Sequence, residues 1–327
     1  MKYNPAYNGT LRQIGCDKFF AFYWTNSQLI ACKELCKQRD AILCIDATGG
    51  ICHKLNRPST GATSGHIFLY EGVLKTTGRR SIPVVQMLSE IHNTNFITYW
   101  LKEWIRSGAP FPKTIVCDMS QALVGAIVQS FTLCANVGVY LQNVWNLLRG
   151  SEVEPPSSFV RLDNAHVMKT VPGWPCLRDK PRKVKEFYMR SVAQLIKCET
   201  MERGRLILKA LFVIALSESE GTGERNSPTQ CELSLNWMKK LLSADTIDVS
   251  VWLSVSQSHN EAFDSEAEVI QAQQNPFKVW LDNLHASAVE ELQDADDGWR
   301  TNGLFLPEFV KDIKRLGAWF PLISCIE

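Results

Sequence analysis

Two short apolar runs in this chain each end in a single aspartate. The first run, Ala41 to Ile45, is followed by Asp46 and then by a Thr-Gly-Gly turn. The second run reads Thr-Ile-Val-Cys over residues 114–117 and is followed by Asp118. An apolar run of this length predicts a buried strand. Because strand interiors disfavour aspartate and an unpaired buried carboxylate is costly, each aspartate is expected at the end of its strand.

The segments around these two strands carry a regular pattern. Residues 66–74 and 81–88 read as further strands, which predicts an antiparallel meander with the strand before Asp46. Residues 93–107 then repeat apolar side chains with a helical period, which predicts an amphipathic helix leading to the strand before Asp118. A strand, a helix and a strand in this order normally form a crossover that places the second strand parallel to the first. Residues 159–166 read as a third strand that ends in polar groups.

The pattern divides the chain into three predicted regions. Residues 1–40 form an N-terminal packing segment, a strand or a less regular element rich in aromatic side chains, and then a helix that Ser27 caps. Residues 41–170 form the α/β core, and residues 171–327 form a mainly helical region interrupted by an exposed polar loop at residues 217–230.

Composition and charge narrow the class of protein. The 327 residues have a net charge of +1, so no overall field indicates a nucleic-acid partner. Arg79-Arg80 and residues 180–185 could contact phosphates, but solvated loops are the favoured interpretation of both stretches. The 11 cysteines lack the paired spacing of a zinc site. No export signal is evident, and no apolar run reaches the roughly 18 residues of a membrane span. These features predict an intracellular protein with reduced thiols and no membrane partner.

The two aspartates suggest a metal site if their strands are neighbours. Asp46 and Asp118 would then lie close together, and like charges at short range repel unless a cation bridges them. Carboxylate oxygens are the ligands that Mg²⁺ prefers. The alternative is that each aspartate only supports a turn or caps a helix.

Four stretches resemble DDE-type transposases of the Mutator-like kind, and transposase-derived proteins of insect genomes still more closely. They are Ile45 to Gly50, Pro83 to Glu90, Trp100-Leu101 and Val116 to Ile127. The resemblance implies a ribonuclease-H-like mixed sheet, with three antiparallel and two parallel strands and a helical insertion or C-terminal body. It also implies DNA as the partner, a nuclear location, and catalytic Mg²⁺ or Mn²⁺ held by Asp46 and Asp118. Whether several copies assemble is left open.

The resemblance also raises two questions about the site. Residues 161–169 resemble the family's post-strand histidine segment, which makes His166 a candidate supporting residue, but Asp163 stands where the family usually has cysteine. The family takes a third acid from a later helix. The acids considered for this role, none with the family's neighbouring residues, are Glu218, Glu220, Glu224, Glu261 and Glu266. Since residues 320–327 resemble the stretch before that helix, truncation before the third acid is an open alternative.

Other interpretations remain open. Two carboxylates alone predict weak metal binding and poor DNA cleavage, so the chain could instead be a non-catalytic transposase relic that binds DNA or protein. Actin-like ATPases share the core but have Asp-x-Gly-Thr, and haloacid-dehalogenase-type phosphatases need Asp-x-Asp; Thr48 disfavours both. Four histidines lack metal-ligand spacing and are interpreted as surface or core residues: His53, His92, His259 and His285.

Overall fold

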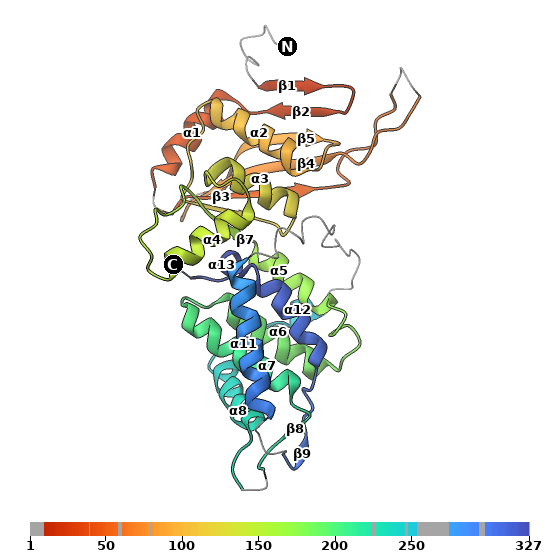
Figure 1. Cartoon of the computed structure of the whole chain (residues 1–327). Helices are drawn as coiled ribbons and strands as arrows, with labels where there is room; N and C mark the ends of the chain where they lie inside the picture. The colour runs from red at the N-terminus through yellow and green to blue at the C-terminus, as the bar shows by residue number, and fades with distance from the viewer. Residues whose placement is uncertain are drawn as a thin grey trace. The chain divides into compact units, whose positions relative to one another are not determined.

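The computed structural model describes most of the chain as two compact units (Figure 1). The described residues are 10–38, 40–57, 61–78, 80–223, 226–245, 248–253, 275–293 and 298–326. The sheet unit comprises Met1–Asn143 and Glu154–Asp163, and the helical unit comprises Val144–Val153 and Asn164–Glu327. None of the described helices is both long and apolar enough to span a membrane.

The sheet unit is built on one seven-stranded mixed sheet with the order β1-β2-β5-β4-β3-β6-β7. The strands are β1 (Leu11–Gly15), β2 (Phe20–Tyr23), β3 (Ile42–Thr48), β4 (Phe68–Lys75), β5 (Ile82–Ser89), β6 (Thr114–Cys117) and β7 (Phe159–Leu162). β3, β6 and β7 pair in parallel, and the other neighbours pair antiparallel. The predicted meander and crossover are therefore confirmed.

The number of strands in the sheet was predicted wrongly, as five instead of seven. The aromatic N-terminal segment forms the hairpin β1–β2, and β2 pairs with β5 along the antiparallel edge. Phe22 on β2 is fully buried and its ring packs 5.7 Å from that of Phe96. The type of this aromatic-rich segment was undecided from the sequence. Its aromatic side chains attach the hairpin to the core.

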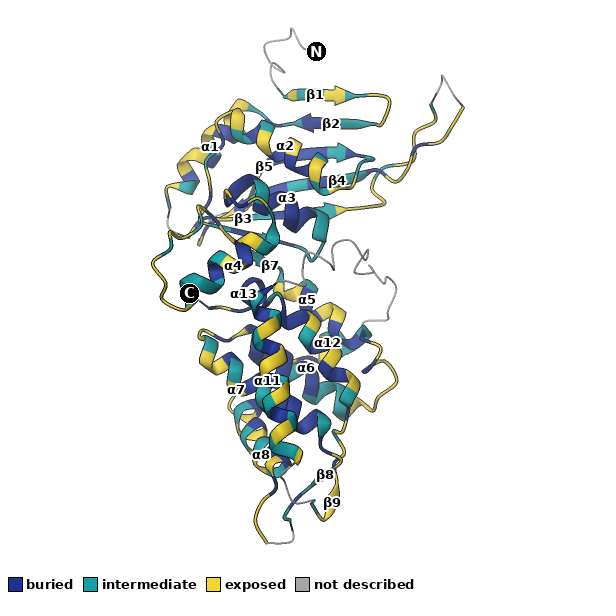
Figure 2. Cartoon of the chain, in the orientation of Figure 1, coloured by how far each residue is buried: buried dark blue, intermediate teal, exposed yellow. Residues whose placement is uncertain are grey.

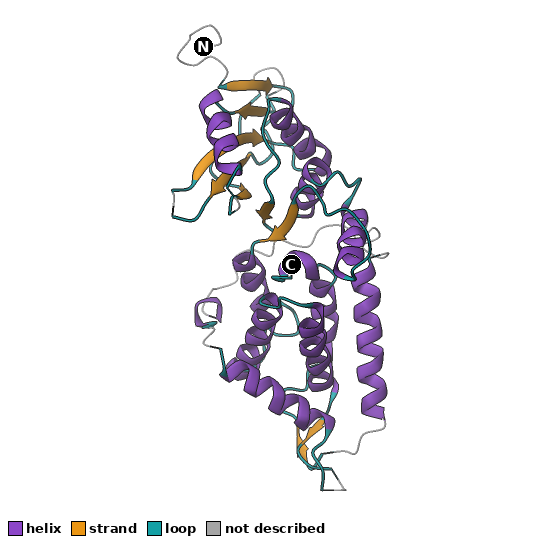
Figure 3. Cartoon of the chain, turned by 90° about the vertical axis from the view of Figure 1, so that its left-hand side faces the viewer, coloured by secondary structure: helices purple, strands orange, loops and turns teal. Residues whose placement is uncertain are grey.

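Helices of the sheet unit lie against both faces of this sheet (Figure 3). They are α1 (Asn26–Cys36), α2 (Thr94–Arg106) and α3 (Gln121–Phe131). α2 presents Trp100, Leu101 and Trp104 to the core, where all three are fully buried. α1 begins two residues earlier than predicted, because Thr25 and not Ser27 is its N-cap and forms a capping box with Gln28.

β7 is held in place by a side chain from α4 (Val137–Leu148), a helix that runs from the sheet unit into the helical unit. The buried Tyr140 hydroxyl accepts a hydrogen bond of 2.9 Å from the Val160 amide. Burial raises the pKa of Tyr140 to about 12, so the phenol stays neutral at ordinary pH.

Tyr140→Phe is expected to destabilise the protein by about 1–3 kcal/mol, because it leaves a buried amide without its partner. Urea unfolding measures this loss. Tyr99→Phe is the matched control, since that hydroxyl bonds Gln13 at the exposed surface and its removal should cost less than about 0.5 kcal/mol. Equal effects of the two substitutions would contradict the role of Tyr140.

The helical unit contains most of the remaining elements. They are α5 (Asn164–Thr170), η1 (Val171–Gly173), α6 (Arg182–Ile196), α7 (Met201–Leu216), α8 (Gln230–Ser243), α9 (Ser250–Leu253), α11 (Pro276–Gln293), α12 (Pro307–Gly317), α13 (Phe320–Ile323) and the short hairpin β8 (Ser219–Glu220)–β9 (Arg300–Thr301). α7 is buried along most of its length, whereas α11 buries only the face that carries Phe277, Leu281, Leu284 and Ala288 (Figure 2).

Two predictions for this part of the chain were wrong in detail. The third strand ends at Leu162, and residues 164–166 belong to α5 instead. The polar segment at 217–230 is not wholly exposed, because Ser217 and Thr229 are buried and the Thr229 hydroxyl donates to the Gly221 carbonyl at 3.0 Å. Residues 224 and 225 of this segment lie outside the described residues.

Candidate carboxylate site

The parallel register of the sheet aligns the two predicted site residues. The last paired residues of β3 and β6 are Ile45 and Cys117, so Asp46 and Asp118 are the next residues on neighbouring strands. Asp46 differs from the prediction in one respect. It lies inside β3, two residues before the strand ends, because the pairing with β4 continues beyond the last contact with β6. The predicted turn follows, with Gly50 at a φ of 77° that favours glycine.

A third aspartate stands at the equivalent step of β7. Cys117 pairs with Leu162, and the Asp163 amide that follows donates to the Cys117 carbonyl at 2.7 Å. The buried Cys117 thiol responds to all three aspartates. Burial is the largest cause that raises its pKa, and the negative charges of Asp118, Asp46 and Asp163 raise it further. The three aspartates therefore lie near the same end of the parallel strands β3, β6 and β7.

The two predicted ligands differ in how the backbone holds them. Asp46 is exposed, and its Oδ1 accepts from the Ala47 amide at 2.8 Å. Asp118 is half-buried, and its Oδ1 accepts from the Ser120 amide at 3.0 Å. Ser120 in turn is the N-cap of α3. Asp118 is therefore fixed by the turn that starts a helix, although the cap itself is Ser120.

His92 lies beside the turn that holds Asp118. The sequence did not predict this position for His92. Its Nε2 lies 3.4 Å from the Ser120 hydroxyl, and its Nδ1 contacts the Tyr70 hydroxyl. The His92 ring stacks on Tyr70 with 5.9 Å between centroids. The pKa of Tyr70 is raised, first by burial and then by the charge of Asp118. No ligand spacing identifies His92 in the sequence; its position just beyond β5 is the available signal.

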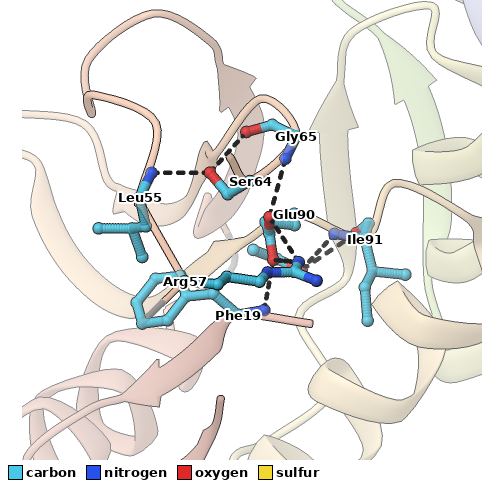
Figure 4. Close-up of polar contacts among 8 residues, drawn as sticks. Phe19, Leu55, Arg57, Ser64, Gly65, Glu90 and Ile91 are labelled. Carbon is cyan, nitrogen blue, oxygen red and sulfur yellow. Dashed lines mark hydrogen bonds and ion pairs between the residues drawn. The ribbon is translucent and has the colours of Figure 1, made fainter. Parts of the chain in front are cut away.

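A second cluster fixes the loop between Asp46 and β4 (Figure 4). The Glu90 side chain, only 4% exposed, accepts from the Phe19 amide at 2.5 Å and from the Gly65 amide at 2.9 Å. Arg57 Nη2 donates to the same carboxylate at 2.9 Å. Burial alone would raise the pKa of Glu90, but the two backbone donors and Arg57 outweigh it and lower the pKa. Glu90 thereby ties the β1–β2 turn and the long loop to the end of β5.

The other predicted site residues belong to the helical unit. His166 lies on α5, and its Nδ1 is buried with no hydrogen-bond partner among the described residues. Glu220 lies on β8 and forms an ion pair of 2.8 Å with Arg300. Three acids considered for the third position, Glu224, Glu261 and Glu266, lie outside the described residues. Within the described ranges, no three His, Cys, Asp or Glu side chains gather closely enough to hold a metal ion.

Comparison with known proteins shows what this chain is similar to. No family model matches the chain. The chain is 30% identical over 324 residues to the 120.7 kDa protein in the NOF-FB transposable element of Drosophila melanogaster. It is similar to a transposable-element protein. The match covers 98% of this chain and 30% of that protein, so the chain spans under a third of its relative's length. The similarity therefore includes the helical unit, where the sequence motifs were weak.

Proposed function

We propose that this chain contains the ribonuclease-H-like carboxylate core of a DDE-type transposase and acts on DNA phosphodiester bonds. One observation carries the proposal: the in-register parallel pairing of β3 and β6, which aligns Asp46 and Asp118. The similarity to a transposable-element protein supports it. The nucleus follows as the compartment in which such a protein would meet its DNA.

The sheet topology fits this proposal. Within the seven strands, the order β5-β4-β3-β6-β7 contains three antiparallel strands followed by two parallel ones. This is the arrangement that the sequence motifs imply for a ribonuclease-H-like core. The β1–β2 hairpin extends the antiparallel edge and leaves the parallel strands, which carry the aspartates, unchanged.

The donor set suits a divalent cation of the magnesium type, because Asp46 and Asp118 offer only carboxylate oxygens. When bound, such an ion would stabilise the charge that develops at the phosphorus during in-line displacement. Asp46 is exposed and would be accessible to a DNA strand, while the Ser120 amide orients Asp118. Two carboxylates leave the ion mainly to water, so the proposed activity of this chain is weak.

The second candidate function is binding without catalysis. In that case the chain would be a module of transposon origin that binds DNA or protein. The observation in its favour is that the described residues contain no cluster of three metal-ligand side chains. Mn²⁺ binding and plasmid nicking distinguish the two functions. In the enzyme, Asp46→Asn and Asp118→Asn should each weaken Mn²⁺ binding and remove nicking. In the non-catalytic module, neither substitution should change Mn²⁺ binding, and no nicking should occur with or without them.

His92→Phe is expected to weaken Mn²⁺ binding about tenfold, as loss of a residue that orients a ligand commonly does. Phenylalanine keeps a ring against Tyr70 but cannot contact the Ser120 hydroxyl. Because His92 is exposed, the free energy of unfolding should change by less than about 1 kcal/mol. Electron paramagnetic resonance of unbound Mn²⁺ measures the affinity, and an unchanged affinity would refute this role for His92.

A further inference from the structure

A short segment of the helical unit concentrates positive charge. Residues 178–185 read Arg-Asp-Lys-Pro-Arg-Lys-Val-Lys, with five basic side chains and one acidic. The chain as a whole has a net charge of only +1, so this basic segment is a local feature that the overall balance conceals. Arg178, Lys180, Arg182 and Lys183 are all exposed.

The basic segment rests on a folded base. Trp174 and Leu177 are buried just before it, and the Trp174 ring packs 5.8 Å from that of Phe309 on α12. The Leu177 carbonyl accepts from the Lys180 amide at 3.1 Å, and Lys185 Nζ donates to the Arg178 carbonyl at 2.6 Å. Because these contacts fix the backbone before any partner arrives, binding would require little additional ordering of the chain.

The charges of the basic segment are not neutralised locally. Among the described residues, no ion pair joins a carboxylate to any of its cations. Other cations of the same unit do form such pairs, and Lys197 with Asp245, Lys209 with Glu291 and Lys314 with Asp282 are examples. A row of five cations with one acid, Asp179, among them attracts a polyanion, and displacement of the polyanion's counterions favours binding.

The start of α6 adds to this field. Pro181 is the N-cap of the 15-residue helix and provides no side-chain cap. The partial positive charge of a helix N-terminus therefore lies among Lys180, Arg182 and Lys183. The basic segment also lacks an aromatic side chain for base stacking, so it fits a phosphate backbone better than unpaired bases.

We infer that the basic segment is a surface of the helical unit that binds the phosphate backbone of duplex DNA without reading its sequence. The choice of DNA rests on the proposed function. The contacts would come from Arg178, Lys180, Arg182 and Lys183, while Lys185 supports the turn. The surface serves to hold DNA and takes no part in the chemistry at the carboxylates.

The test uses the full chain and a fluorescent 30-base-pair duplex in EDTA, which separates binding from any metal chemistry. The triple variant Lys180→Gln, Arg182→Gln, Lys183→Gln should bind about tenfold or more weakly, with a shallower dependence of affinity on salt. The control removes equal charge from exposed lysines of the same unit, through Lys239→Gln, Lys240→Gln and Lys311→Gln. The control should retain most of the wild-type affinity.

The outcomes separate this inference from the proposed function. Equal affinity of the two triple variants, or no binding by the wild type, would overturn the inference, while Mn²⁺ binding would still decide the carboxylate site. Selective loss of binding by the first triple variant supports the inference even if that site proves inert. Vesicles containing anionic phospholipid serve as a second probe. If the first triple variant loses binding to vesicles but not to DNA, the surface recognises membranes and the inference is wrong.

Discussion

Replacing Asp46 or Asp118 with asparagine is expected to weaken Mn²⁺ binding by about tenfold to a hundredfold, since each substitution removes a proposed charged ligand. The wild-type affinity should itself be low, on the order of 0.1–1 mM, because two carboxylates leave most of the coordination to water. Plasmid nicking by the chain should be slow or undetectable, and either substitution should remove whatever nicking occurs. Phosphoryl transfer depends mainly on positioning and charge stabilisation, which a loosely held ion supplies poorly.

Thermal unfolding distinguishes this role of the two aspartates from a structural one. Neutralising one member of a group of like charges relieves repulsion, so without metal each asparagine variant should melt at the wild-type temperature or slightly above. Glu34→Gln, at an exposed position of α1, is the control and should alter neither Mn²⁺ binding nor melting. Nicking that persists in Asp46→Asn would rule out Asp46 as part of the active site.

Replacing Glu90 with alanine is expected to cost about 2–3 kcal/mol, the penalty for leaving buried donors without an acceptor, since Arg57 is 31% exposed and can regain water. The substitution leaves the Phe19 amide, the Gly65 amide and the Arg57 guanidinium without their hydrogen-bond acceptor. Urea unfolding measures the loss. Glu103→Gln is the control, because its ion pair with Arg106 on α2 is largely exposed and should contribute less than about 1 kcal/mol.

The same carboxylate predicts how stability depends on pH. Because the fold lowers the pKa of Glu90, its contribution is complete above the unfolded value of about 4.3 and is lost as pH falls through the folded value. The stability difference between wild type and Glu90→Gln should therefore be largest near neutral pH and shrink below about pH 4. A difference that grows on acidification would contradict a lowered pKa.

The sequence predicted the parts of this fold that depend on local pattern. The apolar runs before Asp46 and Asp118 are short and bounded by turn residues, and the crossover rule fixed the parallel pairing of their strands. The N-terminal hairpin was not predicted as part of the sheet, because its pairing with β5 joins residues more than 60 positions apart. A local pattern contains no information about such a partner.

The surroundings of the site could not be predicted for a similar reason. β5 and β6 run in the same direction and end at the same edge of the sheet, with β4 and β3 between them. His92 and Ser120 meet beyond that edge, and no sequence spacing links the two residues. Glu90 stood in a stretch chosen for its resemblance to transposases, yet its partners come from two separate connections: Phe19 from the β1–β2 turn, and Arg57 and Gly65 from the loop between β3 and β4. The identity of such residues is visible in the sequence, but their roles emerge only from tertiary contacts.

The sheet unit is interrupted in sequence, and this affects how the protein is made. β7 returns to the sheet only at residues 159–162, after the chain has entered the other unit at residues 144–153. A nascent chain that has reached residue 150 could pair six strands at most, with β6 as an open edge. Open edges recruit strands from neighbouring molecules, so slow translation of this stretch would favour misassembly on the ribosome. Expression fragments should accordingly end beyond residue 163.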